Sequence, residues 1–390
     1  MKYPLFKVHI DKFAALAEIG EVFDSGFINE GTQVTELTTA MRIRFETDQL
    51  VLANSCTSTL AMSLKLAGVR YLDEVISTPM TCVATNCPVI TANAKLVWAD
   101  INPKTGCIDP DSVKQCFEKN PKIKAVIAVA WAGNPPDMEG LRHICDEYGA
   151  KLILDAAHAF DATYKKKQIH LLADYTCYSF QAIKHFTTGD GGMLICRDKS
   201  DYERSKKLKW FGIDRDVAKD SDGNWKGQHW DFDIAEVGYK FNMNNVAAAI
   251  GLSQLPHIDN LLQIHRDNGD SYAGLLIGSR FVTPLEVSRG LDPFDFDSSQ
   301  WVYTVLLKPE YANIRDQVLQ GLNARGIGAG LVHVPNDAYT CFAGIKRPLP
   351  GVQEFFERQI SLPVGWWLKF SDIEIITQQL NEVCNELTRT

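Results

Sequence analysis

The sequence predicts an α/β protein with a parallel sheet, followed by a smaller α+β unit. Between residues 46 and 196, short apolar runs alternate with amphipathic segments. The apolar runs are continuous rather than alternating, as in strands that are buried on both faces of a parallel sheet. Strand–helix alternation of this kind is most simply accommodated by a right-handed α/β wind. With 390 residues, the chain is long enough for two domains.

In the first part of the chain, strands are predicted at the apolar runs and helices at the amphipathic segments between them. Gly68 follows the first of these helices and is expected to end it, because glycine readily adopts the left-handed conformation at a helix end. The predicted strands are 49–55, 73–79, 94–101, 124–133 and 150–155, and the predicted helices are 57–68, 84–93 and 137–149.

The later part of the chain is predicted to begin with a long connecting helix over residues 251–276, kinked at Pro256 because proline lacks a backbone donor. A strand, a helix and a terminal helix follow, so we expect a large domain over 1–250 and a connector with a small α+β domain over 251–390. The polar segment 214–234 is expected to be an exposed excursion and a candidate binding loop. The last three elements are predicted at 298–310, 312–327 and 372–387.

Composition excludes several classes of function. The composition is 45% hydrophobic and 23% charged, with a net charge of −8 and no long basic run, which argues against sequence-independent nucleic-acid binding. The N-terminus lacks the apolar core of a signal peptide, and no stretch approaches the roughly 20 apolar residues of a membrane span. The ten cysteines show no paired framework and no metal-ligand spacing, so we expect buried free thiols, no metal and a cytoplasmic location.

Three features are predicted to meet where strands of the sheet end, which is where ligands bind in open α/β folds. The first is the segment 54–60, a strand-to-helix turn rich in small hydroxyl residues. Free N–H groups and the helix dipole at such a turn form an anion site. The alternative is an ordinary serine or threonine helix cap, which is a common way to begin any helix.

The other two features are a carboxylate and an amine. Asp155 follows four apolar residues, so partial burial should raise its pKa unless a cation or donor faces it. The alternative is that Asp155 caps a helix. Lys184 follows the apolar run ending at Phe180 and precedes a Thr/Gly-rich turn. Burial would lower its pKa and make it nucleophilic, whereas the alternative is a surface lysine.

Together the three features match the needs of one cofactor, pyridoxal 5'-phosphate. This cofactor requires an anion cradle for its phosphate, a carboxylate that keeps its ring nitrogen protonated, and a lysine that bonds to its aldehyde. Its protonated ring then acts as an electron sink for a carbanion at the neighbouring carbon.

The sequence also resembles a known family, the DegT/DnrJ/EryC1/StrS sugar aminotransferases, which are fold-type-I pyridoxal phosphate enzymes. This resemblance extends over almost the whole chain and implies a mostly parallel seven-stranded sheet in the large domain. The segments that carry it are "SGFINEGTQVTELT", "LANSCTSTLAM", "DEVISTPMTCVATN", "ADINPKTGCIDP", "NPPDM", "LILDAAHAFDATYKKKQI", "ADYTCYSFQAIKHFTTGDGGML" and "GYKFNMNNVAAAIGLSQL".

The resemblance implies a role for particular residues of this chain. Lys184 would bond to the cofactor and move protons, and Asp155 would pair with the pyridine nitrogen. His158 stands where the family usually has glutamine, near the cofactor's phenolic oxygen. The phosphate would be held by Ser179 together with groups at Cys56 and Thr57.

Three positions depart from the family's usual pattern. Cys56 replaces a glycine, and Cys82 stands where many members place an aromatic ring against the pyridine, so a polarizable thiol contact could replace stacking. Lys240 replaces an asparagine that typically reaches the phosphate of the partner subunit's cofactor, and its charge suits an anion site.

The reaction implied is transfer of an amino group from an amino acid, most often L-glutamate in this family, through pyridoxamine phosphate to a nucleotide-linked keto sugar. A 4-keto-6-deoxyhexose is preferred, with an amino sugar for a surface polysaccharide or glycoconjugate as the product. His333, Arg215 and Lys219 are the candidate substrate contacts, and shared sites imply a homodimer. The alternatives are a 3-keto sugar or cyclitol substrate, or a non-catalytic regulatory homologue.

Overall fold

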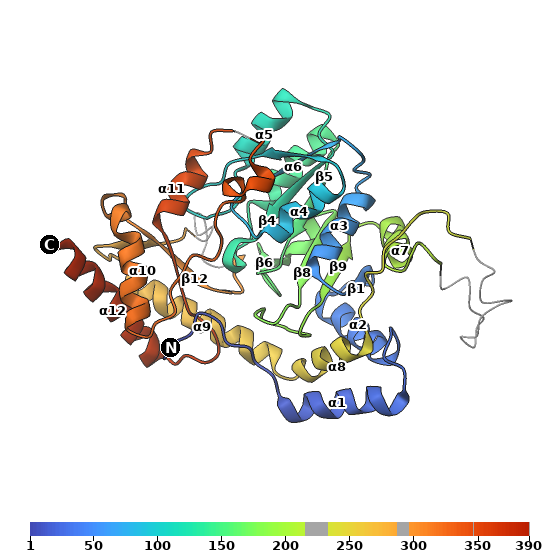
Figure 1. The fold of residues 1–390 in the computed structure, drawn as a ribbon, viewed down its shortest axis with the longest axis horizontal. Helices are drawn as coiled ribbons and strands as arrows, with labels where there is room; N and C mark the ends of the chain where they lie inside the picture. Colours follow the sequence, from blue (N-terminus) through green and yellow to red (C-terminus); the bar gives the residue numbers. More distant parts are fainter. Residues whose placement is uncertain (215–232, 287–295, 346, 390) are drawn as a thin grey trace.

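The computed structural model describes residues 1–214, 233–286, 296–345 and 347–389 (Figure 1). Its centre is a seven-stranded sheet with the strand order β1-β9-β8-β5-β4-β2-β3. All neighbours in this sheet are parallel except β9, which runs antiparallel to both β1 and β8. The expected mostly parallel α/β fold is therefore confirmed. The strands are β1 Leu50–Ala53, β2 Glu74–Ser77, β3 Lys95–Trp98, β4 Ala125–Val129, β5 Lys151–Asp155, β8 Tyr175–Ser179 and β9 Gly192–Cys196.

Helices cover both faces of this sheet, as continuous apolar strands require. Along β1, Leu50 and Leu52 belong to one core, whereas Val51 and Ala53 belong to the other, because successive side chains point to opposite faces. The first core is closed by α2 Thr32–Phe45, α5 Pro110–Lys119 and α6 Met138–Tyr148, and the second by α3 Cys56–Leu66, α4 Val83–Thr91 and α7 Lys199–Leu208.

A second unit contains a three-stranded antiparallel sheet with the order β10-β12-β13 and its own apolar core. Tyr3 packs into this core from the far end of the chain, so the N-terminal segment crosses to the second unit. The elements of this unit are β10 Val282–Pro284, β12 Tyr303–Leu307, β13 Gln359–Leu362, α9 Ile258–Leu276, α10 Arg315–Ala324, α11 Pro350–Arg358 and α12 Phe370–Thr388.

Smaller elements complete the fold. A third sheet joins β11 Phe296–Asp297 to the hairpin of β6 Thr163–Tyr164 and β7 Lys167–Gln168. Helix α1 Lys12–Ser25 lies along the outside of the molecule beside α8 Asn245–Gln254 (Figure 1). The 3₁₀ turns are Trp131–Gly133, Ile169–Leu172, Pro309–Ile314, Asn336–Ala338 and Thr340–Phe342.

The long helix predicted over 251–276 is two helices, so this prediction was wrong in detail. Helix α8 ends at Gln254 and α9 begins at Ile258, with Pro256 between them. Proline has no N–H to donate and its ring would clash with the carbonyl of Leu252, so the helix breaks completely rather than bending. The predicted excursion at 214–234 lies largely outside the described residues.

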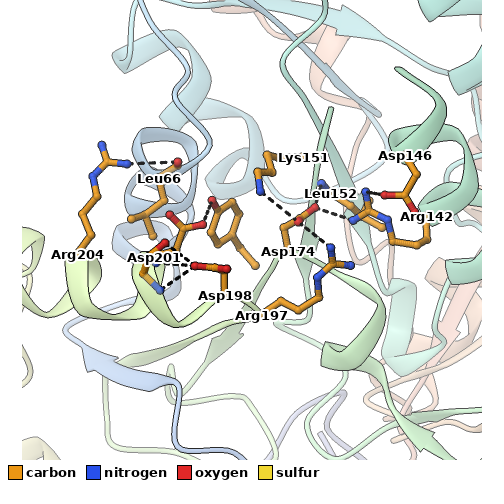
Figure 2. Close-up of polar contacts among 12 residues, drawn as sticks. Leu66, Arg142, Asp146, Lys151, Leu152, Asp174, Arg197, Asp198, Asp201 and Arg204 are labelled. Carbon is orange, nitrogen blue, oxygen red and sulfur yellow. Dashed lines mark hydrogen bonds and ion pairs between the residues drawn. The ribbon is translucent and has the colours of Figure 1, made fainter. Parts of the chain in front are cut away.

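Asp174 is a buried carboxylate that connects the segments at which β5 and β8 begin (Figure 2). It accepts hydrogen bonds from Arg142 at 2.6 Å and from the N–H of Leu152 at 2.8 Å, and it also pairs with Lys151 and Arg197. Burial alone would raise the pKa of Asp174, but these donors outweigh it and lower the pKa. The cluster is a structural anchor at the amino ends of the strands.

None of the helices within the described ranges combines the length and the apolar character needed to cross a membrane. All ten cysteines lie within those ranges and are free thiols, and seven of them are buried, as expected from the apolar runs that contain them.

Candidate active site

A cavity of about 310 Å³ opens at the carboxyl ends of the central strands. Its walls come from the segments that follow β1, β2, β5 and β8, together with the N-terminal segment and the second unit. The cavity therefore lies at the position expected for ligands in an open α/β sheet. The predicted site residues that line it are Cys56, Thr57, Cys82, Asp155, His158, Ser179, Lys184 and His333.

The start of α3 provides an anion cradle. Ser55 caps the helix, because its hydroxyl accepts a hydrogen bond from the N–H of Ser58 at 3.1 Å. The helix cap considered as the alternative is therefore present, and it does not exclude an anion site at the same turn. The N–H groups of Cys56 and Thr57 lie in the first turn, where a helix offers no acceptor of its own. Gly192 permits this geometry, because a Cβ there would lie 2.5 Å from the backbone nitrogen of Cys56.

Asp155 ends β5 and points its carboxylate into the cavity wall. Its Oδ2 accepts a hydrogen bond from the hydroxyl of Thr85 at 2.7 Å, and its Oδ1 accepts the N–H of Ala157 at 3.1 Å. Burial raises the pKa of Asp155, while Thr85, Ala157 and Lys184 oppose the rise. Residues 156–162 form turns, so the alternative that Asp155 caps a helix is wrong.

Lys184 lies in the cavity and not on the outer surface, which excludes the surface-lysine alternative. Burial lowers the pKa of its amine to about 8, and Asp155 and Cys56 partly oppose that effect. The amine therefore exists in both charge states near neutral pH. A tight turn, closed by bonds from Thr188 N to Phe180 O and from Phe180 N to Gly191 O, carries the lysine.

Two histidines form part of the cavity wall with their rings stacked at 5.4 Å. His158 has no hydrogen-bond partner at Nδ1, and His333 has none at Nε2, within the part of the chain that the structure describes. Burial lowers the pKa of His158 well below its ordinary value and that of His333 to about 3. Both rings are therefore neutral at physiological pH, and each offers one donor and one acceptor.

The remaining predicted residues lie elsewhere. Lys240 is exposed, donates to Asn242 and lies over the ring of Trp210 at 4.1 Å, and it is not among the described residues that line the cavity. Arg215 and Lys219 fall outside the described residues.

Among the contributors to the site that sequence reasoning missed are Thr85, Trp301 and Phe6. Thr85 follows Cys82 by three residues, so helical spacing could have indicated that both share a face. Trp301 precedes β12 and Phe6 lies near the N-terminus, and no local pattern distinguishes them from core aromatic residues.

The cavity fits the expected pyridoxal phosphate. It presents the start of α3 with free N–H groups, which a Cβ at Gly192 would displace, a carboxylate held by Thr85, and an amine with a lowered pKa. These are the three groups that the cofactor requires, and they converge from segments far apart in the chain.

Comparison with known proteins shows the family to which this chain is similar. The model of the DegT/DnrJ/EryC1/StrS aminotransferase family matches residues 10–381. The spore coat polysaccharide biosynthesis protein SpsC of Bacillus subtilis is 28% identical, with 94% of each chain covered. The UDP-4-amino-4,6-dideoxy-N-acetyl-beta-L-altrosamine transaminase of Campylobacter jejuni is 25% identical, with 92% of each chain covered.

Among solved structures, the putative sugar aminotransferase Spr1654 of Streptococcus pneumoniae superposes with a TM-score of 0.88. It is 26% identical to this chain, and 99% of each chain is covered. Its structures include both a PLP form and a PMP form.

Proposed function

Because the chain belongs to the DegT/DnrJ/EryC1/StrS aminotransferase family, we propose that it transfers an amino group from an amino acid to the ketone of a nucleotide-linked sugar. The observation that carries this proposal is the convergence of the Lys184 amine, the Asp155 carboxylate and the start of α3 on one cavity. A fold of this family without those groups would support binding alone.

Pyridoxal phosphate, when bound, would supply an electron sink that stabilises negative charge on the reacting carbon. The residues of this chain would hold it. Asp155 would accept a hydrogen bond from the protonated ring nitrogen, which requires the carboxylate to be ionised despite its raised pKa. The remaining contacts would come from Cys56, Thr57 and Ser179 at the phosphate, His158 at the phenolic oxygen and Cys82 against the ring.

Lys184 would move the proton. With a pKa of about 8, its Nζ can accept a proton from the amino-donor carbon and return it without a large energetic penalty in either direction. The same atom would serve in both halves of the reaction, first with the amino acid and then with the sugar. The largely apolar walls around it, including Ile183 and Val332, would exclude competing water.

For the substrate we propose a 4-keto-6-deoxyhexose linked to a nucleotide, with L-glutamate as the amino donor. The relative from Campylobacter jejuni is a transaminase for a UDP-linked 4-amino-4,6-dideoxy sugar, which supports this choice. The name of SpsC supports a surface polysaccharide as the destination of the amino sugar. His333 would contact the sugar, and Arg215 and Lys219 would contact the diphosphate. A 3-keto sugar and a cyclitol ketone are the alternatives.

We propose that the working unit is a homodimer in which Lys240 reaches the phosphate in the partner's site. Large apolar side chains are exposed on α1 and the segment after it, as on a surface that a second copy covers. Lys240 is itself exposed and does not line its own cavity. The exposed apolar side chains are Phe13, Leu16, Phe23, Phe27 and Ile28.

The cofactor is tested first by absorbance. Purified protein incubated with pyridoxal phosphate is expected to gain a visible absorption band that the Lys184→Ala variant lacks. A Lys114→Ala variant is the matched control, because Lys114 is exposed on α5 outside this cavity and should leave the band intact. A wild-type protein without any visible band would instead favour a non-catalytic binding protein.

The substrate is tested by a mass-spectrometric screen. UDP-, dTDP- and GDP-linked 3-keto and 4-keto sugars and an inosose would each be offered with glutamate or glutamine. Amine transfer to a nucleotide-linked 4-keto-6-deoxyhexose is the expected result. Transfer to the inosose alone would replace the sugar proposal with the cyclitol alternative.

A further inference from the structure

The loop 298–301, which leads into β12, is held at the cavity by hydrogen bonds that involve backbone groups. Ser299 accepts a bond from His185 at 2.7 Å, and Gln300 accepts one from His265 at 2.8 Å. Ser299 also donates its hydroxyl to the carbonyl of His158 at 2.9 Å. The N–H of Trp301 donates to Ala132 at 2.9 Å. The loop therefore has a single well-defined position.

To hold this position, the loop contains one residue in a strained backbone conformation, Gln300, and lies against two glycines, Gly133 and Gly269. Gln300 has a φ of +49°, a conformation that side chains rarely adopt and that costs of order 1 kcal/mol or more. A Cβ at Gly133 would lie 2.8 Å from the nitrogen of Gln300, and one at Gly269 would lie 2.7 Å from its side chain. Strain of this kind persists where the surroundings over-determine it, and it gathers at functional sites.

The strained loop places the indole of Trp301 directly against the reactive lysine. Its Nε1 donates to the carbonyl of Ile183, the residue before Lys184, at 2.9 Å. His158 stacks on the indole at 3.8 Å and 14°, and Phe6 packs against it at 4.8 Å and 30°. The Nζ of Lys184 lies 3.7 Å from the centre of the ring.

We propose that Trp301 is a positioning residue that holds the amine of Lys184 whenever this amine is not bonded to the cofactor, and that it favours the protonated amine. This inference rests on the proposed function, because an aminotransferase must release its lysine from the cofactor and use it as a proton carrier. The indole face is electron-rich, so it attracts an ammonium group but not a neutral amine. The fixed indole also confines the amine to one place.

The surroundings of Lys184 both favour and oppose the protonated form of its amine. Asp155, Cys56 and Cys82 favour the charged amine, while burial opposes it. His158, His333 and His185 also face it, but their own lowered pKa values leave them neutral. Trp301 therefore adds to Asp155, Cys56 and Cys82 as a further influence that keeps the amine protonated in an apolar cavity.

The test measures the titration of Lys184 in the full-length protein freed of cofactor. Its acylation by a water-soluble ester would be followed from pH 6 to 11 by mass spectrometry of the peptide that contains it. The Trp301→Leu variant is expected to lower the apparent pKa by about 0.5 to 1 pH unit, because the protonated amine loses its cation–π partner. Trp301→Phe keeps a smaller aromatic face and is expected to fall between Trp301→Leu and the wild type.

Phe370→Leu is the control, since Phe370 is an exposed aromatic residue at the start of α12 that does not line the cavity, and it should leave the titration of Lys184 unchanged. The proposal would be overturned by a pKa that stays the same or rises in Trp301→Leu, or by a Trp301→Phe variant no different from Trp301→Leu. The measurement uses no cofactor, so its outcome does not depend on the absorbance test. Either test can fail while the other succeeds, and the two proposals are therefore judged separately.

Discussion

At the scale of single residues, the charge on Lys184 links stability to pH. Its pKa of about 8, against an ordinary 10.5, means that between these pH values the unfolded lysine keeps a proton that the folded one has released. The unfolded state then binds more protons, so stability rises with pH across this window. Below pH 8 both states are protonated, and the full cost of burying the charge remains.

Replacing the lysine should remove this dependence. We expect the cofactor-free Lys184→Met variant to gain stability over the wild type at pH 7 and to lose about 2.5 kcal/mol of that advantage by pH 10. Urea unfolding of both proteins at the two pH values measures the difference. A constant difference would mean that Lys184 titrates at its ordinary pKa.

Thr85 is expected to affect the affinity for pyridoxal phosphate as strongly as a residue that contacts the cofactor directly. Its hydroxyl donates to Asp155 at 2.7 Å and in turn lies 2.8 Å from the hydroxyl of Thr81. Thr85→Val leaves one carboxylate oxygen buried without a donor, which raises the pKa of Asp155 further and weakens its charge. We expect pyridoxal phosphate to bind roughly tenfold or more weakly.

An absorbance titration of the cofactor would measure this effect, with Thr85→Ser as the matched control because it keeps the hydroxyl. Equal affinity in Thr85→Val and Thr85→Ser would show that the hydrogen bond to Asp155 has no part in binding.

At the scale of secondary structure, the anion cradle depends on how closely α3 approaches β9. The antiparallel strand β9 begins at Gly192, and the backbone of Ser55 and Cys56 lies where a Cβ would be. Glycine is needed here for space and not for a left-handed conformation. Gly192 therefore allows the segment that follows Lys184 to enter β9 directly beside the start of α3.

Gly192→Ala is therefore expected to displace the start of α3. The contact at 2.5 Å involves backbone atoms, so relief requires a shift of the helix, with a cost of about 1–3 kcal/mol in stability. Affinity for pyridoxal phosphate should fall at least tenfold in the same absorbance titration. Gly274→Ala is the control, because its Cβ would meet nothing within 4 Å and helix propensity favours alanine.

At the scale of the whole molecule, the cavity is assembled from distant parts of the chain. We propose that 1–250 and 251–390 act as two domains, although Tyr3 packs in the core of the second unit. The indoles of Trp366 and Trp367 hold the N-terminal segment by donating to Lys7 and Pro4. This segment brings Leu5 and Phe6 to the cavity.

The role of Lys240 across a dimer can be tested by mixing variants. A Lys184→Ala chain supplies Lys240, and a Lys240→Ala chain supplies Lys184, so a mixed dimer would hold one complete site. After random exchange of subunits, about a quarter of the sites should be complete, because half of the dimers are mixed and each has one such site. Transaminase activity measures the recovery. If mixing restores no activity although mixed dimers form, Lys240 does not act across the interface.

The sequence by itself placed five of the seven strands of the central sheet and three of the helices beside them, and it singled out the candidate central groups. Continuous apolar runs predicted strands buried on both faces, and the residues that follow those strands, such as Asp155, could be placed at one edge of a parallel sheet. Lys184 could be singled out because an anion site and a carboxylate were predicted at the same edge. These inferences depend on local patterns and on the chemistry of one cofactor.

Only the tertiary structure decided which side chains surround those groups. Trp301 and Phe6 reach the cavity from segments about 300 residues apart in the chain, and Thr85 reaches Asp155 across the sheet. Contacts of this kind are set by how separate elements pack, and local sequence periodicity carries no information about them.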